Sequence, residues 1–132
     1  MFRQTLFIVF AAVFVTSCAT TPPEPELTSD IVVIDEAQRA DYWVTRQDGV
    51  YVKVNSRRPM PSGCGHVVLQ YVIDSRGDVF NATVLESEPP GGFDRAALAQ
   101  LTEWEYVPAE SNPGRTPVQV TETVEFKTRD DC

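Results

Sequence analysis

Alternation of apolar and polar residues predicts two β-strands joined by a tight turn, in segments 66–74 and 79–86. Both segments are rich in β-branched and aromatic residues, and their period of two is typical of half-buried strands. The apolar face of the first strand consists of Val67, Leu69, Tyr71 and Ile73. Gly77 lies between the strands and can take the positive φ that closes a short loop. We therefore predict a β-hairpin.

A helix and a third strand are predicted after the hairpin. The run Pro89-Pro90-Gly91-Gly92 ends the hairpin, and Asp94 is a suitable N-cap for a helix. Pro108 ends this helix. Its apolar stripe consists of Ala97, Leu98, Leu101 and Trp104. Segment 117–127 then alternates again. Glu122 lies on the apolar face of this strand, and the cost of burying a carboxylate indicates that the middle of the strand is open to solvent.

These elements predict an α+β fold, a three-stranded antiparallel sheet with one helix packed on one face. A right-handed crossover through the helix brings strand 117–127 back parallel to strand 79–86. A split β-α-β arrangement then places strand 66–74 between the other two, in the order 2-1-3. Strand 117–127 is an edge of this sheet unless another segment covers it.

The order of these segments resembles the C-terminal domain of the TonB family. The resemblance rests on GHVVLQYVIDSRGDVFNATVLESEP, FDRAALAQLTEWEYVPA and PVQVTETVEF, and it covers Gly65 to Phe126. Family members tend to carry a Tyr-Pro pair shortly before the first strand, whereas this chain departs from the pattern with Met60-Pro61.

The resemblance implies a module that binds a short periplasmic peptide of an outer-membrane receptor by adding it to the sheet as a strand. In this mode, exposed backbone groups of an edge strand provide affinity and alternate side chains provide selectivity. The candidate edge strand consists of Val118, Gln119, Val120, Thr121, Glu122, Thr123, Val124 and Glu125.

The N-terminus has the features of an export signal. Residues 1–17 carry an early positive charge and an apolar run that is too short for a permanent membrane helix. The motif Val15-Thr16-Ser17-Cys18 resembles a lipobox, in which Cys18 becomes lipidated, and Ala19 after it points to the outer membrane. The alternative is an ordinary signal peptide, or a hydrophobic helix with a chance cysteine.

The chain is accordingly divided into four parts. The expected boundaries are 1–17 for the signal peptide, 18–30 for a lipidated tether, 31–60 for an accessory segment and 61–132 for the TonB-like domain. The tether contains three prolines and is expected to be semi-rigid. Residues 31–34 are either a strand or a packed segment.

A second hairpin is predicted in residues 42–54, where Asp48-Gly49 lies between two β-rich runs. It has no counterpart in the family pattern. Three positions are open for it: beside strand 79–86, beneath the uncovered face of the sheet, or over the edge of strand 117–127.

The net charge restricts the class of binding partner. The value of −8 argues against nucleic acid or anionic lipid heads as partners.

The cysteine content predicts a disulfide. With Cys18 assigned to lipid, Cys64 and Cys132 remain, and an even pair in an exported protein indicates a disulfide. Two free thiols are the alternative.

The sequence offers little for catalysis. The single histidine, His66, opens a strand, and no cluster of metal ligands or phosphate-binding loop occurs, so we expect neither an enzyme nor a metal or other cofactor. Trp104 and Tyr106 could stack on a ligand, but their spacing and the resemblance favour core packing.

The predicted protein is thus a lipid-anchored, periplasm-facing protein of the outer membrane that binds a receptor or another envelope protein. Because its N-terminal segment is predicted to be removed and its tether is short, we expect it not to transduce energy itself. The alternative is a structural envelope lipoprotein that forms a homodimer through the same edge or belongs to a larger envelope complex.

Overall fold

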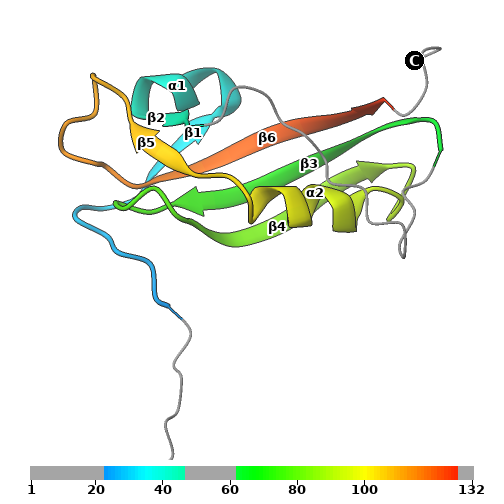
Figure 1. The fold of residues 1–132 in the computed structure, drawn as a ribbon, viewed down its shortest axis with the longest axis horizontal. Coiled ribbons are helices and arrows are strands. Elements are labelled where there is room, and N and C mark those ends of the chain that lie inside the picture. Colours follow the sequence, from blue (N-terminus) through cyan, green and yellow to red (C-terminus); the bar gives the residue numbers. More distant parts are fainter. Residues whose placement is uncertain (1–22, 47–61, 128–132) are drawn as a thin grey trace, which may run out of the picture.

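The computed structural model describes residues 23–46 and 62–127. Its elements are shown in Figure 1. In chain order they are β1 (Val32–Asp35), the 3-10 helix η1 (Glu36–Gln38), α1 (Arg39–Tyr42), β2 (Trp43–Thr45), β3 (Cys64–Ile73), β4 (Val79–Glu88), α2 (Asp94–Leu101), β5 (Tyr106–Pro108) and β6 (Val118–Lys127). The α+β class is therefore as predicted.

The main sheet has four strands in the order β1-β6-β3-β4. Strand β3 is antiparallel to both β4 and β6, which is the pairing expected of the three predicted strands. However, the description as a three-stranded antiparallel sheet in the order 2-1-3 is wrong, because β1 adds to β6 in parallel and makes a mixed sheet of four strands. Local patterning did not distinguish a strand from a packed segment in residues 32–35. The strand is short, and its partner strand is distant in sequence.

Asp74 organises the turn between β3 and β4. Its side chain is fully buried, and Oδ1 accepts hydrogen bonds from the backbone N–H groups of Arg76, Gly77 and Asp78 at 2.9, 3.1 and 3.0 Å. Gly77 has a φ of +96°, as the sequence predicted. A Cβ at this glycine would lie 2.2 Å from the carbonyl oxygen of Tyr106. The turn therefore requires glycine for conformation and for space.

The turn also holds the segment that enters the domain. Asp74 Oδ2 accepts a hydrogen bond from the Glu26 N–H at 2.9 Å, and the Ser75 N–H donates to the Glu26 carbonyl at 2.8 Å. Thr28 follows with its N–H donating to Ser75 Oγ at 3.0 Å. The chain thus docks on the domain from Glu26 onward (Figure 1).

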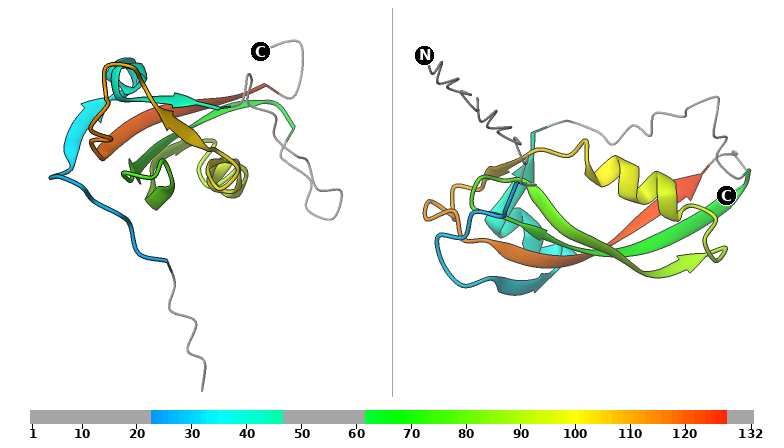
Figure 2. Two further views of the ribbon diagram at one scale, coloured as in Figure 1. Left: turned by 60° about the vertical axis from the view of Figure 1, so that its left-hand side comes forward. Right: turned by 90° about the horizontal axis from the view of Figure 1, so that it is seen from below.

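Two elements lie side by side and cover one face of the main sheet. Helix α2 lies over one end, and a small antiparallel sheet of β2 and β5 lies over the other, as Figure 2 shows. The fully buried side chains of the covered face include Val67, Leu69, Tyr71 and Ile73, as the alternation predicted. Trp43 of β2 and Phe93 before α2 complete this core.

Helix α2 is shorter than predicted. Phe93, and not Asp94, occupies the N-cap position, and it makes no side-chain capping bond. The helix ends at Leu101, so Trp104 lies beyond it. Trp104 is half-buried and packs edge-on against Tyr71, with ring centroids 6.3 Å apart. Core packing of Trp104 and Tyr106 is therefore as expected.

The signal peptide, Cys18 and Ala19 lie outside the described residues, as do Cys132 and the Asp48-Gly49 turn of the second predicted hairpin. The described part of that hairpin, β2, pairs with β5, its Trp43 opposite Pro108. In the ranges 23–46 and 62–127, no helix has the length and apolarity needed to cross a bilayer.

Candidate functional site

The edge of β6 that faces away from β3 can be traced from backbone hydrogen bonds. The Pro117 carbonyl accepts from the Val32 N–H at 3.0 Å, and the Thr123 N–H donates to Glu36 Oε2 at 3.3 Å. Successive strand residues direct their backbone groups to opposite sides of the strand. The backbone groups that point away from β3 therefore belong to Gln119, Thr121, Thr123, Glu125 and Lys127.

Strand β1 occupies the first half of this edge. Residues 32–35 pair with residues 118–121 in register, from Val32 opposite Val118 to Asp35 opposite Thr121. The expectation that Val118, Gln119, Val120 and Thr121 are available to a partner is therefore wrong. The physical reason is that β1 directs Ile34, only 5% exposed, into the core beside these residues, and its backbone bonds satisfy their outward groups.

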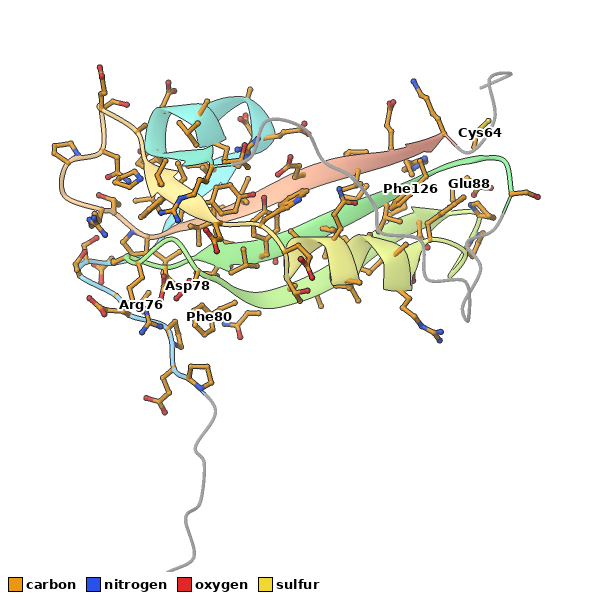
Figure 3. The ribbon with its side chains drawn as sticks, in the orientation of Figure 1. Cys64, Arg76, Asp78, Phe80, Glu88 and Phe126 are labelled. Atoms are coloured by element: carbon orange, nitrogen blue, oxygen red, sulfur yellow. The ribbon has the colours of Figure 1, made fainter. Side chains whose placement is uncertain are left out.

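The second half of the edge has no paired strand within the described ranges. Beyond Glu122, the Glu36 carboxylate accepts from the Thr123 N–H, and the outward backbone groups of Glu125 and Lys127 have no strand beside them there. Figure 3 shows Phe126 near this end of β6, close to Cys64 and Glu88 of the neighbouring strands. The candidate site is this open half-edge, residues 123–127.

A shallow groove adjoins the half-edge. Its lining residues are Cys64, Gly65, His66, Glu88, Thr123, Glu125, Phe126 and Lys127. The Phe126 ring is buried and stacks on Phe93, with centroids 4.7 Å apart. Gly65 allows this packing, because a Cβ there would lie 2.4 Å from the Phe93 ring. The strand at the half-edge is therefore anchored to the core by the stacked rings of Phe93 and Phe126.

The groove carries both signs of charge. Lys127 Nζ lies 3.3 Å from Glu125 Oε2, and His66 Nε2 lies 3.7 Å from Glu86 Oε1. All four side chains are substantially exposed, so these pairs add little to stability. They leave donors and acceptors at the surface for the side chains of a bound strand.

Glu122 is not open to solvent, contrary to the sequence-based expectation. Its side chain is 12% exposed, and Oε2 accepts a hydrogen bond from the Tyr71 hydroxyl at 2.5 Å. Arg39 Nε lies 3.3 Å from the same oxygen, in a charge contact that is not an aligned hydrogen bond. The burial cost is thus offset by a cation and a donor, both brought in from other elements.

Tyr71 and Tyr106 extend this buried cluster. Their hydroxyl groups are 2.8 Å apart, and the Arg39 guanidinium lies over the Tyr106 ring, 5.6 Å from its centroid. Burial raises the pKa of Tyr71, and the nearby Tyr106 and Glu122 raise it further. Burial also raises the pKa of Tyr106. Both phenols therefore stay neutral donors, and the cluster is a structural support for the middle of β6.

The remaining predicted site residues fall in different places. Cys64 begins β3, at the groove, whereas Cys18 and Cys132 lie outside the described residues. No group of three or more metal-ligating side chains occurs within residues 23–46 and 62–127.

Sequence reasoning missed Glu36 and Arg39, which adjoin the half-edge through Thr123 and Glu122. Both come from the η1–α1 segment, which places them against the middle of β6. A signal was present: Glu122 on an apolar face needed a cation, and a partner could have been sought among the arginines. Nothing in the local pattern says which of them it is.

Comparison with known proteins gives one family match and two similar solved structures. The family model described as "Gram-negative bacterial TonB protein C-terminal" matches residues 64–128. The chain is similar to the solution NMR structure of the Pseudomonas aeruginosa TonB CTD, with 23% identity, a TM-score of 0.48, and 75% of this chain and 95% of that one covered. It is also similar to the TonB2 protein from Vibrio anguillarum, with 24% identity, a TM-score of 0.44, and 84% and 95% covered. No curated protein matches the sequence.

Proposed function

Since residues 64–128 of this chain belong to the family of TonB C-terminal domains, we propose that the protein binds an extended peptide of an envelope protein by strand addition, without catalysing a reaction. The partner class is a periplasmic segment of an outer-membrane receptor or of another envelope protein. The acidic net charge, −8, argues against nucleic acid.

The observation that carries the proposal is the open half-edge at residues 123–127. Its outward backbone groups are unpaired by any strand in the described part of the chain, while β3 holds the other side in register. A row of such groups on a rigid strand is a template for an added strand. The groove beside Glu125 and Lys127 then accepts alternate side chains of the peptide.

The proposal includes a lipid anchor at Cys18 in the outer membrane. Glu26, where the chain docks on the domain, lies eight positions after Cys18. A fully extended chain of this length reaches about 26–29 Å. The domain is therefore held close to the membrane in which Cys18 is anchored. Because such a reach is too short to cross the periplasm, we propose that the protein does not transduce energy itself.

A disulfide between Cys64 and Cys132 is also part of the proposal. The register supports it: Cys64 lies opposite Lys127, five residues before Cys132. The bond would fasten the segment after β6 to the start of β3, next to the half-edge.

A second candidate function is a structural envelope protein that pairs with itself. The same half-edge favours it, because two copies could add to each other there. Its acidic side chain, Glu125, weighs against the register in which the two copies of Glu125 lie opposite each other, since like charges in that position destabilise a sheet.

Binding can be tested with a proline substitution. Glu125→Pro removes an outward-facing N–H and leaves the pairing with β3 intact, because the N–H groups bonded to β3 belong to the even-numbered residues. Glu125→Thr is the matched control, which changes the side chain and keeps the donor.

Synthetic peptides that copy periplasmic segments of outer-membrane receptors are titrated against both variants and the wild-type chain. We expect Glu125→Pro to raise the Kd about three- to tenfold, which corresponds to one lost hydrogen bond. Glu125→Thr should bind like the wild type. Equal affinities for all three proteins would rule out strand addition at this half-edge, and a concentration-dependent sedimentation coefficient would favour self-pairing.

A further inference from the structure

The outermost strand of the main sheet, β1, has a second edge that faces away from β6. The Val32 N–H points to β6, so the backbone groups of Val33 point outward. The Asp35 N–H also points outward, but it donates to Gln38 Oε1 at 3.2 Å. Within the part of the chain that the structure describes, no strand pairs with this edge. Val33 therefore presents both a free donor and a free acceptor there.

The side chains around Val33 are apolar and exposed. Ile31, Val32 and Val33 are 38%, 37% and 72% exposed, and Val33 is the most exposed large apolar residue of the described ranges. β-branched residues of this kind favour an extended partner on the pleated surface. The usual protections of an edge strand, lysine and proline, are absent from residues 30–36.

Acidic residues flank this apolar run at both ends. Asp30 precedes it, and Asp35 and Glu36 follow it. No ion pair joins any of the three to a lysine or arginine among the described residues. Their negative charge is therefore available to an approaching partner.

We propose that the outer edge of β1 is a docking site for an extended segment of another protein, with an apolar β-branched centre and lysine or arginine at its ends. The apolar centre would lie beside Val33. Its backbone would accept a hydrogen bond from the Val33 N–H and donate one to the Val33 carbonyl. The basic ends would lie near Asp30 and Asp35. The partner would thus bind by strand addition, and complementary charges at its ends would provide the specificity.

Charge weighs against a second copy of this chain as the occupant. In an antiparallel pair centred on Val33, Asp30 of one copy faces Glu36 of the other. This register, in which the two Val33 residues exchange backbone hydrogen bonds, places like charges opposite each other, which destabilises the pair. Each chain also carries a net charge of −8.

This inference goes beyond the proposed function and does not rest on it. The two edges belong to different strands, β1 and the end of β6, and each can be blocked alone. Val33→Pro removes the outward N–H of β1 without removing any bond to β6, and an extended residue 32 tolerates a following proline. Val33→Thr is the matched control.

The probes are two synthetic heptapeptides with the same Thr-Val-Thr-Val-Thr centre, one with lysine and one with glutamate at both ends. Binding to the full chain is measured by fluorescence anisotropy at low and at physiological salt. We expect the lysine peptide to bind at least fivefold more tightly than the glutamate peptide, and less tightly as salt rises. Val33→Pro should weaken this binding at least fivefold, while Val33→Thr and Glu125→Pro should not change it.

Equal binding of the lysine peptide to Val33→Pro and to the wild type would overturn the proposal. So would loss of binding in Glu125→Pro, which would place the peptide at the end of β6. Asp30→Asn provides a readout that does not involve proline, and it should reduce the preference for lysine ends. Reversible dimerisation that Val33→Pro abolishes would show that a second copy is the occupant, against the inference.

Discussion

The hydroxyl of Tyr71 donates a 2.5 Å hydrogen bond to Glu122 Oε2, which lies on the neighbouring strand β6. Arg39 approaches the same carboxylate from α1, with its Nε 3.3 Å away. A carboxylate on the apolar face of a strand is thereby held by one donor from β3 and one cation from an upstream helix. The two halves of the β6 edge, one occupied and one open, meet at this residue.

Replacing Glu122 should therefore destabilise the fold. Glu122→Ala leaves Arg39, 20% exposed, without its partner and the Tyr71 hydroxyl without this acceptor. Because the pair is only partly buried, we expect a loss of about 1–3 kcal/mol in the free energy of unfolding, measured with urea. Glu105→Ala breaks the exposed pair with Arg46 and should cost less than about 1 kcal/mol. Similar losses for both variants would contradict the role of Glu122.

Stability should fall at alkaline pH because of the two buried tyrosines. Their pKa values are raised in the folded state by burial, so the unfolded chain loses these protons first. The stabilisation is complete below the ordinary tyrosine pKa of about 10 and falls above it, by up to about 1.4 kcal/mol per pH unit for each tyrosine. Urea unfolding between pH 8 and 11 measures this slope. Tyr71→Phe should make it shallower, and an unchanged slope would count against the assignment.

Gly77→Ala should be among the more damaging single-methyl additions in the chain. It forces a φ of +96° on a residue with a Cβ, and that Cβ would lie 2.2 Å from the Tyr106 carbonyl oxygen. We expect a loss of at least about 2 kcal/mol, from strain and displacement of β5. Gly114→Ala is the control, since a Cβ there meets nothing within 4 Å, and its stability should be nearly unchanged. Thermal unfolding of the two variants makes the comparison.

Asp74→Asn should undock the segment that enters the domain while leaving the turn closed. The Asn carbonyl oxygen can still accept from the turn N–H groups, but its amide would face the Glu26 N–H, a second donor. Faster hydrogen exchange at the Glu26 and Thr28 amides is the expected result. Asp78→Asn, at a side chain that is 61% exposed, should leave these amides protected. Full protection in both variants would show that Asp74 does not hold the segment.

Cys132→Ser should lower stability if Cys132 is the partner of Cys64. Closing a loop of this length stabilises by about 4 kcal/mol in the chain-entropy model, which sets an upper value for the loss. Mass spectrometry with and without reductant identifies the bonded pair directly. Identical unfolding curves for the wild type and Cys132→Ser would contradict the pairing.

Local patterning was sufficient for the elements that pair with near neighbours. The hairpin of β3 and β4, the need for glycine at position 77 and the alternating faces of β6 all follow from period-two spacing and turn chemistry, which act over a few residues. The antiparallel position of β3 between β4 and β6 followed from the short connections and the handed crossover.

Tertiary structure alone decided which part of the β6 edge is open. Val32 pairs with Val118, and Glu36 and Arg39 reach β6 from far upstream, so their contacts carry no local signal. Residues 32–35 could form a strand anywhere a partner was available, and the free energy of burying Ile34 against the core selected β6. The sequence by itself determined the strands and the domain type, whereas long-range packing determined which of their edges a partner can reach.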